Sequence, residues 1–297
     1  ILEDELWAQR YIKWLDGFPD GDVFNIPSIG DAEALNYEEN QAVRYTAMDT
    51  GNFQFSITDY VTSATYITEK MLQDSYYASQ LTSQFVPKQA RAIAVRMETD
   101  VLAIGQPGKP GGQTVSSLNT INGGDHRFVA SGTSGTIVPQ DFARAKYALQ
   151  KARVPQQNLV AIVDPSVEFA LSTMTNLVNV SNNPRWEGIV RDGMSSGMRF
   201  LMNVYGFDVY VSNYLPNGIT ETISGSTVTA NGVANLFFSA APDVLPFVGA
   251  LRMPPRVDSD WDKDLRREEY VTATRYGFKL YRPENLVTIL SANTLVL

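Results

Sequence analysis

The sequence predicts an α+β fold in which strand-rich and helix-rich segments are separate along the chain. Apolar residues recur with a period of two from Val23 to Thr68, and strand patterns return near the C-terminal end. Two stretches of helical pattern, Glu69 to Phe85 and Lys88 to Ile104, follow the first strand-rich region. A mixed section of helices and strands begins at residue 139.

Composition narrows the class of protein. The chain has 297 residues, 44% of them hydrophobic, which is enough to fill a sizeable core. Lys and Arg total 24 against 32 Asp and Glu, and the net charge of -8 argues against a protein whose main surface neutralises phosphates. Because there is no cysteine, disulfides and thiolate chemistry are excluded. No apolar run approaches the roughly 20 residues that cross a bilayer, so no membrane partner is expected.

The N-terminal residues are predicted to form an arm. Residues 1–16 show the pattern of a short amphipathic helix, with Trp7 and Trp14 available to anchor it. A Gly- and Pro-containing turn over residues 17–21 ends this helix. Charged residues throughout the first turns do not fit a signal peptide.

A long β excursion is predicted next, over residues 23–68. Its candidate strands are Gln41–Met48 and Phe53–Thr58, joined by a turn at Asp49–Asn52. The excursion is largely polar and has too few apolar residues for a core of its own. We therefore expect it to lie on another surface.

The helical region is predicted to be two helices separated at Pro87, which cannot donate a backbone N–H. The second helix is expected to end at Gly105. A loop rich in Gly and Pro follows over residues 105–112 and continues with little regular structure to about residue 136.

A compact mixed domain is predicted after this loop. Asp164 and Pro165 match the cap and first position of a helix. The predicted elements of this domain are helix Pro139–Arg153, strand Leu159–Val163, a helix from Asp164, helix Ile189–Met202, strand Phe207–Ser212, a hairpin near Glu221–Asn231 and strand Asn235–Ala240. The tail of the chain is predicted to return to β structure, as a closing hairpin of strands Glu268–Tyr281 and Asn285–Leu290.

Motifs for catalysis fail on their context. Gly193–Gly197 fits the G-x-S-x-G pattern around Ser195, but no strand precedes it and the one histidine, His126, comes earlier in the chain. His126 is expected to be a solvated loop residue. Gly108 and Lys109 lack the spacing of a phosphate loop, and Pro110 follows the lysine. We therefore assign no catalytic, cofactor or metal residue.

A run of alternating aspartates could indicate a calcium-binding loop. Asp258, Asp260, Asp262 and Asp264 alternate, but Lys263 stands where an EF-hand loop needs glycine. In a strand these carboxylates would share one face. An intersubunit salt bridge or a solvated edge is the favoured interpretation.

Two segments carry a resemblance to a known family. Met97–Gly108, in which a helix runs into a Gly/Pro loop, resembles the exit of the spine helix in major capsid proteins of tailed bacteriophages, the Hong Kong 97-type fold. Glu268–Asn285 resembles the closing strands of that family. The order of elements resembles the family over nearly the whole chain.

The resemblance implies a division of the chain. Residues 1–21 would be an N-terminal arm and residues 22–68 an extended loop. Residues 69–138 and 251–297 would form the peripheral domain, with its long spine helix. Residues 139–250 would form the axial domain.

The resemblance also implies a function. The chain would be a coat protein, not an enzyme, that assembles into pentamers and hexamers of an icosahedral head around double-stranded DNA, without sequence-specific binding. Scaffolding and portal proteins, and a decoration protein, are candidate partners. The expected location is the virion, after assembly in the host cytoplasm. The alternatives are an encapsulin-like compartment shell, another phage structural protein such as a tail-tube or decoration subunit, and a hydrolase.

Contacts between subunits are predicted at eight residues. The arm is expected to clamp a neighbour, and the loop Leu35–Arg44 to clasp one, so that its deletion would spare folding but impair assembly. The eight residues are Trp7, Trp14, Tyr37, Arg44, Asp258, Asp260, Arg266 and Arg267.

Overall fold

The computed structural model describes residues 6–15, 23–29, 39, 50–74, 78–109, 111–173 and 200–293. Its helices are α1 Glu69–Asp74, α2 Ala78–Leu102, α3 Pro139–Lys151 and α4 Pro165–Thr173. Its strands are β1 Ile12–Leu15, β2 Val23–Ile29, β3 Thr50–Ser56, β4 Asp59–Thr68, β5 Thr120–Ile121, β6 Gly124–Asp125, β7 Arg127–Val129, β8 Leu159–Val163, β9 Phe200–Val204, β10 Phe207–Val211, β11 Ile219–Ile223, β12 Ser226–Ser239, β13 Phe247–Asp262, β14 Arg267–Leu280 and β15 Val287–Ala292. This mixture confirms the predicted α+β class.

A seven-stranded sheet forms the body of the molecule. Its order is β7-β15-β12-β8-β10-β9, with β11 paired to β12. Strand β8 is buried along its whole length, and its odd-numbered residues join the cluster that packs under α3 and α4. Its even-numbered residues, Val160 and Ile162, join the cluster on the opposite face, which includes the end of α2. The sheet is therefore covered on both faces.

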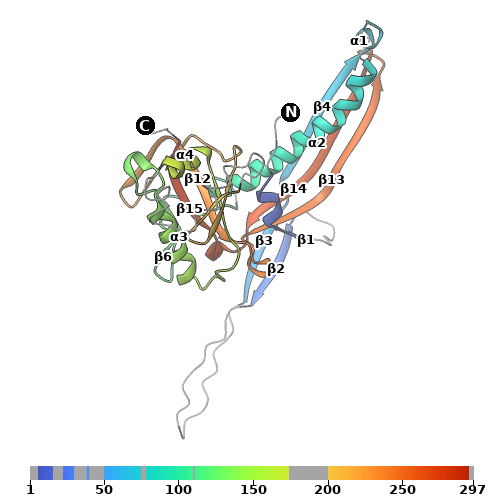
Figure 1. Ribbon diagram of the computed structural model, residues 1–297. Helices are drawn as coiled ribbons and strands as arrows, with labels where there is room; N and C mark the ends of the chain where they lie inside the picture. The colour runs from blue at the N-terminus through green and yellow to red at the C-terminus, as the bar shows by residue number, and fades with distance from the viewer. Residues whose placement is uncertain are drawn as a thin grey trace.

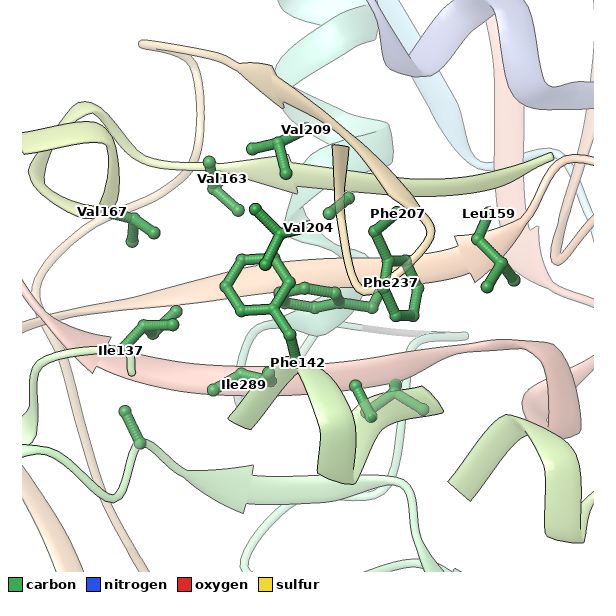
Figure 2. Packing of buried hydrophobic residues seen from close by; sticks show 14 of the residues in the cluster. Ile137, Phe142, Leu159, Val163, Val167, Val204, Phe207, Val209, Phe237 and Ile289 are labelled. Carbon is green, nitrogen blue, oxygen red and sulfur yellow. The ribbon is translucent and has the colours of Figure 1, made fainter. Parts of the chain in front are cut away.

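Aromatic rings fill the layer between α3 and this sheet (Figure 2). The ring of Phe237 on β12 meets Phe142 of α3 edge-on at 5.1 Å and Phe207 of β10 at 5.4 Å between centroids. Edge-to-face pairs of this kind add to the free energy that burial alone provides. This packing fixes α3 to the sheet and leaves its other side facing outward.

A four-stranded sheet forms an arm that extends from the body (Figure 1). Its order is β1-β13-β14-β4, and β13 and β14 form one long antiparallel hairpin. Helix α2 lies along the hairpin: Gln89 donates from Nε2 to the carbonyl of Tyr270 at 3.1 Å and accepts at Oε1 from the hydroxyl of Thr272 at 2.7 Å. Helix α1 lies at the far end of the arm.

The predicted N-terminal helix is wrong in the described residues. A single 3-10 turn, Ala8–Tyr11, is followed by strand β1. Strand β1 pairs in parallel with Phe247–Ala250 of β13, and this edge pairing outweighs the weak helical pattern. The predicted turn at Asp49–Asn52 is also wrong from Thr50 onward, because these residues belong to β3 and pair with β2. The candidate strand Gln41–Met48 lies outside the described residues.

Pro87 does not separate two helices. Helix α2 is 25 residues long and includes Pro87 without a break. The helix packs on the arm sheet, and this tertiary contact offsets the backbone hydrogen bond that proline cannot donate. The loop after α2 is also more regular than predicted: residues 120–129 contain β5, β6 and β7, and β7 joins the body sheet beside β15.

The predicted closing hairpin is wrong, although both of its strands exist. Strand β14 pairs with β13 and β4 in the arm, whereas β15 pairs with β12 and β7 in the body. The short turn Pro283–Asn285 therefore joins two sheets. The end of the predicted helix Ile189–Met202 is wrong as well, because residues 200–202 belong to β9, and the rest lies outside the described residues.

Several elements of the mixed domain are confirmed. Helix α3, strand β8, strand β10 and the hairpin of β11 and β12 lie where the sequence predicts them. Asp164 caps α4, since its Oδ2 accepts from the backbone N–H of Ser166 at 2.9 Å. The division into domains remains a proposal, and sheet membership favours placing β7 and β15 with the body.

Replacing Thr288 with valine is expected to raise the free energy of unfolding by about 1 kcal/mol. Thr288 lies on β15 with no exposed surface, and among the described residues its hydroxyl has no hydrogen-bond partner. Valine keeps the shape and removes the buried polar group. Urea unfolding of the unassembled subunit measures the change, and a loss of stability would show that the hydroxyl is bonded.

Candidate functional site

The outer half of β13 is the most exposed strand segment of the arm. Pro254 to Trp261 are all exposed, whereas the first four residues of β13 are buried. In the described residues this half pairs with β14 alone, because β1 reaches only Ala250. The segment is thus an open sheet edge, and Pro254 and Pro255 at its start limit edge pairing.

The two faces of this half differ. Val257 and Trp261 pair with Thr272 and Glu268, on the face where α2 contacts β14. Both remain exposed, although α2 packs on the neighbouring strands β14 and β4. An apolar strip beside the helix is the result. Further exposed apolar side chains at the far end of the arm are Tyr66, Met71 and Leu265.

The predicted aspartates lie on the opposite, helix-free face. Asp258 pairs with Val271 and Asp260 with Glu269, so both carboxylates share a face with Tyr66 of β4. Arg256 forms an exposed ion pair with Asp258 at 2.8 Å. This face is therefore a charged, solvated edge in the isolated chain.

The predicted arginines lie beside these aspartates. Arg266 pairs with Glu69 of α1 at 2.8 Å, and Arg267 pairs with Glu269 at 2.6 Å. The guanidinium of Arg267 also lies 4.8 Å from the ring centroid of Tyr66. The structure therefore brings Asp258, Asp260, Arg266 and Arg267 together on the outer arm. Their role in contacts between subunits remains a prediction.

The predicted tryptophans lie elsewhere. Trp7 is half-buried on the body: its Nε1 donates to the carbonyl of Val211 at 3.2 Å, and its ring lies 4.5 Å from that of Tyr210. Trp14, on β1, is exposed and meets Phe278 edge-on at 5.9 Å. Tyr37 and Arg44 lie outside the described residues.

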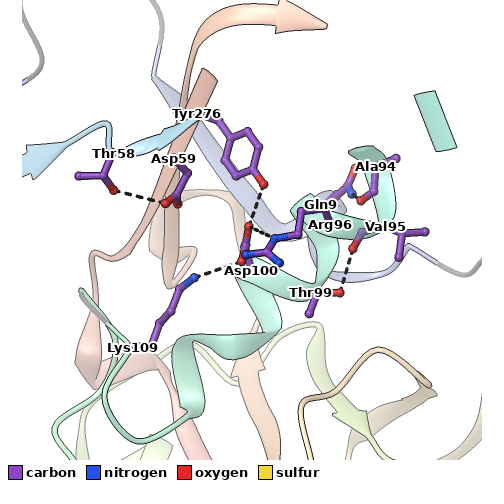
Figure 3. Close-up of polar contacts among 10 residues, drawn as sticks. All are labelled: Gln9, Thr58, Asp59, Ala94, Val95, Arg96, Thr99, Asp100, Lys109 and Tyr276. Carbon is purple, nitrogen blue, oxygen red and sulfur yellow. Dashed lines mark hydrogen bonds and ion pairs between the residues drawn. The ribbon is translucent and has the colours of Figure 1, made fainter. Parts of the chain in front are cut away.

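A buried carboxylate, which the sequence did not single out, joins the arm to the body (Figure 3). Asp100 of α2 accepts from the hydroxyl of Tyr276 on β14 at 2.7 Å, from Nε of Arg96 at 3.1 Å and from Nζ of Lys109 at 3.2 Å. One side chain thus links α2, the arm sheet and the loop that leads to the body. The spacing of Arg96 and Asp100 is its one local signal.

Replacing Tyr276 with phenylalanine is expected to cost about 1–2 kcal/mol of stability at neutral pH, because a hydrogen bond to a charged group is lost. Burial, and then the bond to Asp100, raise the pKa of Tyr276. The folded chain therefore holds this proton more tightly than the unfolded chain. The stability it contributes is present below about pH 10 and is lost as pH rises further. Urea unfolding should show the gap between wild type and variant narrowing above that pH; a constant gap would contradict this.

A second buried carboxylate holds the N-terminal segment on α2. Glu98 has no exposed surface, and its two oxygens accept from the backbone N–H groups of Ala8 at 2.7 Å and Gln9 at 3.2 Å. Burial raises the pKa of Glu98, although these N–H groups oppose the shift. The contact explains why the turn Ala8–Tyr11 lies against α2.

A buried ion pair fixes the body beside this joint. Arg127 of β7 and Glu221 of β11 meet through two contacts, Nε to Oε1 at 3.0 Å and Nη2 to Oε2 at 2.5 Å. Arg127 also donates from Nη1 to the carbonyl of Gly105 at 2.7 Å, where α2 and its 3-10 extension end. The sequence gives no local signal for a pair 94 residues apart.

The expected solvated position of His126 is wrong. The side chain is fully buried, with Nδ1 3.0 Å from the carbonyl of Gly124 and Nε2 3.1 Å from that of Glu284. Ser195 and its motif lie outside the described residues. Within the described ranges no group of three acidic or histidine side chains is placed to hold a metal ion, and no helix there is long and apolar enough to cross a membrane.

A family model and several solved structures match this chain. The family model described as phage capsid protein matches residues 52–289. The capsid structure of the cyanophage P-SCSP1u is 16% identical in sequence and has a TM-score of 0.67. The match covers 99% of this chain and 90% of the cyanophage chain. The structure of Mycobacterium phage Che8 is 15% identical in sequence and has a TM-score of 0.66. The match covers 97% of this chain and 93% of the Che8 chain.

An encapsulin shares the fold too. The holo-SrpI encapsulin complex from Synechococcus elongatus is 12% identical in sequence and has a TM-score of 0.58. The match covers 95% of this chain and 86% of the encapsulin chain. No curated protein sequence matches the chain.

Proposed function

Because the chain belongs to the phage capsid protein family, we propose that its copies form pentamers and hexamers that close into an icosahedral head around a double-stranded DNA genome. The subunit is a major capsid protein of the virion shell. Its work is to tile with copies of itself, and no step of it requires catalysis. Head-to-tail contacts that close into rings, and rings that close into a shell, give this kind of assembly.

The outer arm carries this proposal. An arm built from β13, β14, β4 and α2 extends from the body (Figure 1). The outer half of β13 is exposed on both faces. Val257 and Trp261 are exposed on the face beside α2 and Leu265 in the turn that follows β13, whereas Asp258 and Asp260 lie on the opposite face. Exposed apolar side chains grouped in this way are typical of a surface that another protein covers. In the isolated chain these apolar groups face water, and in a shell a neighbour would cover them.

The predicted regions take roles in this proposal. Strands β1 and β4 pair with β13 and β14 of the same chain. The contacts with a neighbour that we propose for residues 1–21 and 22–68 would therefore come from the parts of these segments outside β1 and β4, and the four-stranded arm sheet with α2 would form the peripheral domain. Scaffolding and portal proteins, and a decoration protein, are the further partners we propose. Assembly would take place in the host cytoplasm.

Deleting residues 35–44 is expected to abolish closed shells while leaving the subunit folded. Of this segment the structure describes Glu39 alone, so the expectation comes from the sequence. Size-exclusion chromatography followed by negative-stain electron microscopy measures the result, and thermal unfolding of the unassembled subunit checks its fold. Normal shells from the deletion variant would show that the loop is not a clasp. Wild-type protein that forms no shell, even with phage assembly partners, would contradict the proposed function.

A compartment shell with protein cargo is the second candidate, because the encapsulin complex shares the fold. The contents of purified particles separate the two. Nuclease-resistant DNA inside them supports a phage head, and a protein cargo without DNA supports the compartment.

A further inference from the structure

Helix α3 carries a concentration of positive charge in an acidic protein. Residues 139–153 contain Arg144, Lys146, Lys151 and Arg153 against one carboxylate, Asp141, whereas the whole chain has a net charge of -8. Asp141 does not offset them at the surface. It is buried at the start of the helix, where its Oδ2 accepts from the backbone N–H groups of Ser131 and Val138.

The cations lie on the outward side of the helix. The inward side of α3 packs in the aromatic layer through Phe142, Ala145 and Leu149. Arg144 and Lys151 are exposed, and Tyr147 between them is half exposed, so the three follow one another along a stripe at helical spacing. We call this surface, with the residues added next, the basic face of α3.

The turn between β9 and β10 extends this face. Lys146 donates from Nζ to the carbonyl of Tyr205 at 2.9 Å, and the ring of Tyr205 is half exposed. Arg153, just past the end of α3, is exposed too. Asp208, on the same hairpin, is on the opposite face of the sheet from α3, because its neighbours Phe207 and Val209 point into the cluster under the helix.

Most of this charge is uncompensated in the isolated chain. Arg144 pairs with Asp125 at 2.7 Å. Elsewhere in the part of the chain that the structure describes, no carboxylate lies within ion-pair distance of Lys146, Lys151 or Arg153. A cation near a helix C-terminus is stabilised by the helix dipole. One cation is enough for that effect, so the dipole does not account for Lys146, Lys151 and Arg153 together.

We propose that the basic face of α3, formed by Arg144, Lys146, Tyr147, Lys151, Arg153 and Tyr205, binds the phosphate backbone of double-stranded DNA without reading its sequence. Lys, Arg and Tyr side chains are the donors that proteins direct at phosphates. Lysine is depleted in the cores of protein interfaces, so two lysines here favour a polyanion over an acidic surface of a second copy. The inference rests on the proposed function in that an enclosed genome would supply the DNA.

The test compares two variants with the same change of charge. The first is Lys146→Gln with Lys151→Gln and Arg153→Gln on the basic face. The matched control is Arg256→Gln with Lys263→Gln and Arg266→Gln, three exposed cations of the outer arm. Fluorescence anisotropy of a short labelled duplex, titrated with unassembled subunit between about 50 and 200 mM salt, gives the affinity and its salt dependence.

The first variant is expected to bind DNA about tenfold more weakly or worse at low salt, and to lower the slope of log K against log salt by about 2–3, since each phosphate contact contributes about 0.9. The control should bind as wild type does. Equal losses in both variants, or no binding by wild type, would overturn the proposal. So would a first variant that binds DNA normally but forms no shells, because the face would then contact subunits.

Failure of this inference can be told apart from failure of the proposed function. Shell formation is scored separately by electron microscopy, and the first variant should still form shells. If thermal unfolding shows that this variant is poorly folded, the double variant Lys151→Gln with Arg153→Gln replaces it. The expected change in the slope of log K against log salt is then about 1–2. Absence of that change would overturn the proposal.

Discussion

Replacing Glu221 with glutamine is expected to lower the free energy of unfolding by about 3–5 kcal/mol, because Arg127 is left charged inside the body without its counterion. Arg127 has no exposed surface, and Glu221 is almost as buried. Burial opposes ionisation of Glu221, but the hydrogen bonds from Arg127 and Ser116 outweigh it and lower its pKa. The stability from this group is therefore present above its ordinary pKa and is lost as pH falls below it. Urea unfolding of the unassembled subunit measures the effect.

Two controls identify the cause of this loss. The double variant Arg127→Met with Glu221→Met should recover most of it, because neither position then carries a buried charge. Glu69→Gln breaks the exposed pair with Arg266 and should cost less than about 1 kcal/mol. If Glu221→Gln costs no more than Glu69→Gln, the buried pair does not stabilise the body as described.

Replacing Leu265 with aspartate is expected to raise the subunit concentration needed for shell formation by about tenfold or more. Leu265 lies in the turn between β13 and β14 and is 58% exposed, so the isolated subunit should lose little stability. If a neighbour covers the side chain in the shell, burial contributes about 1.5–3 kcal/mol, and each 1.4 kcal/mol is a factor of ten. Light scattering against protein concentration measures the threshold.

Tyr147→Asp is the matched control for this prediction. Tyr147 is 50% exposed on the basic face of α3, where we place DNA and not a neighbouring subunit. Its replacement should leave the assembly threshold unchanged. A threshold that moves equally in both variants, or in neither, would exclude the hairpin turn as a specific contact between subunits.

Local patterns predicted the body better than the arm. Strand β8 could be predicted from its continuous apolar run, because a strand buried on both faces leaves that signature in the sequence. The start of α4 could be predicted from Asp164 and Pro165, because the capping bond lies within two residues. Strand β1 could not, since its strand state depends on pairing with Phe247–Ala250. The continuity of α2 through Pro87 likewise depends on Gln89 packing against β14.

The candidate site shows the same limit. Alternation predicted that Asp258 and Asp260 share a face, and the register of β13 confirms it. Sequence could not show that Asp100 meets Tyr276, or Arg127 meets Glu221, because their partners lie 176 and 94 residues away. The charges of the basic face of α3 can be counted in the sequence as four cations against one acid, although the whole chain has a net charge of -8.

The position of β15 sets an order of events during synthesis. This strand lies between β7 and β12 inside the body sheet, about 160 residues after β7 in the chain. A nascent chain that has made β7, α3 and β8 still has an open sheet there, and the core under α3 stays incomplete until Val287 and Ile289 are added. Long-range pairing of this kind slows folding. The body can therefore complete its core only after β13 and β14 of the arm have been translated.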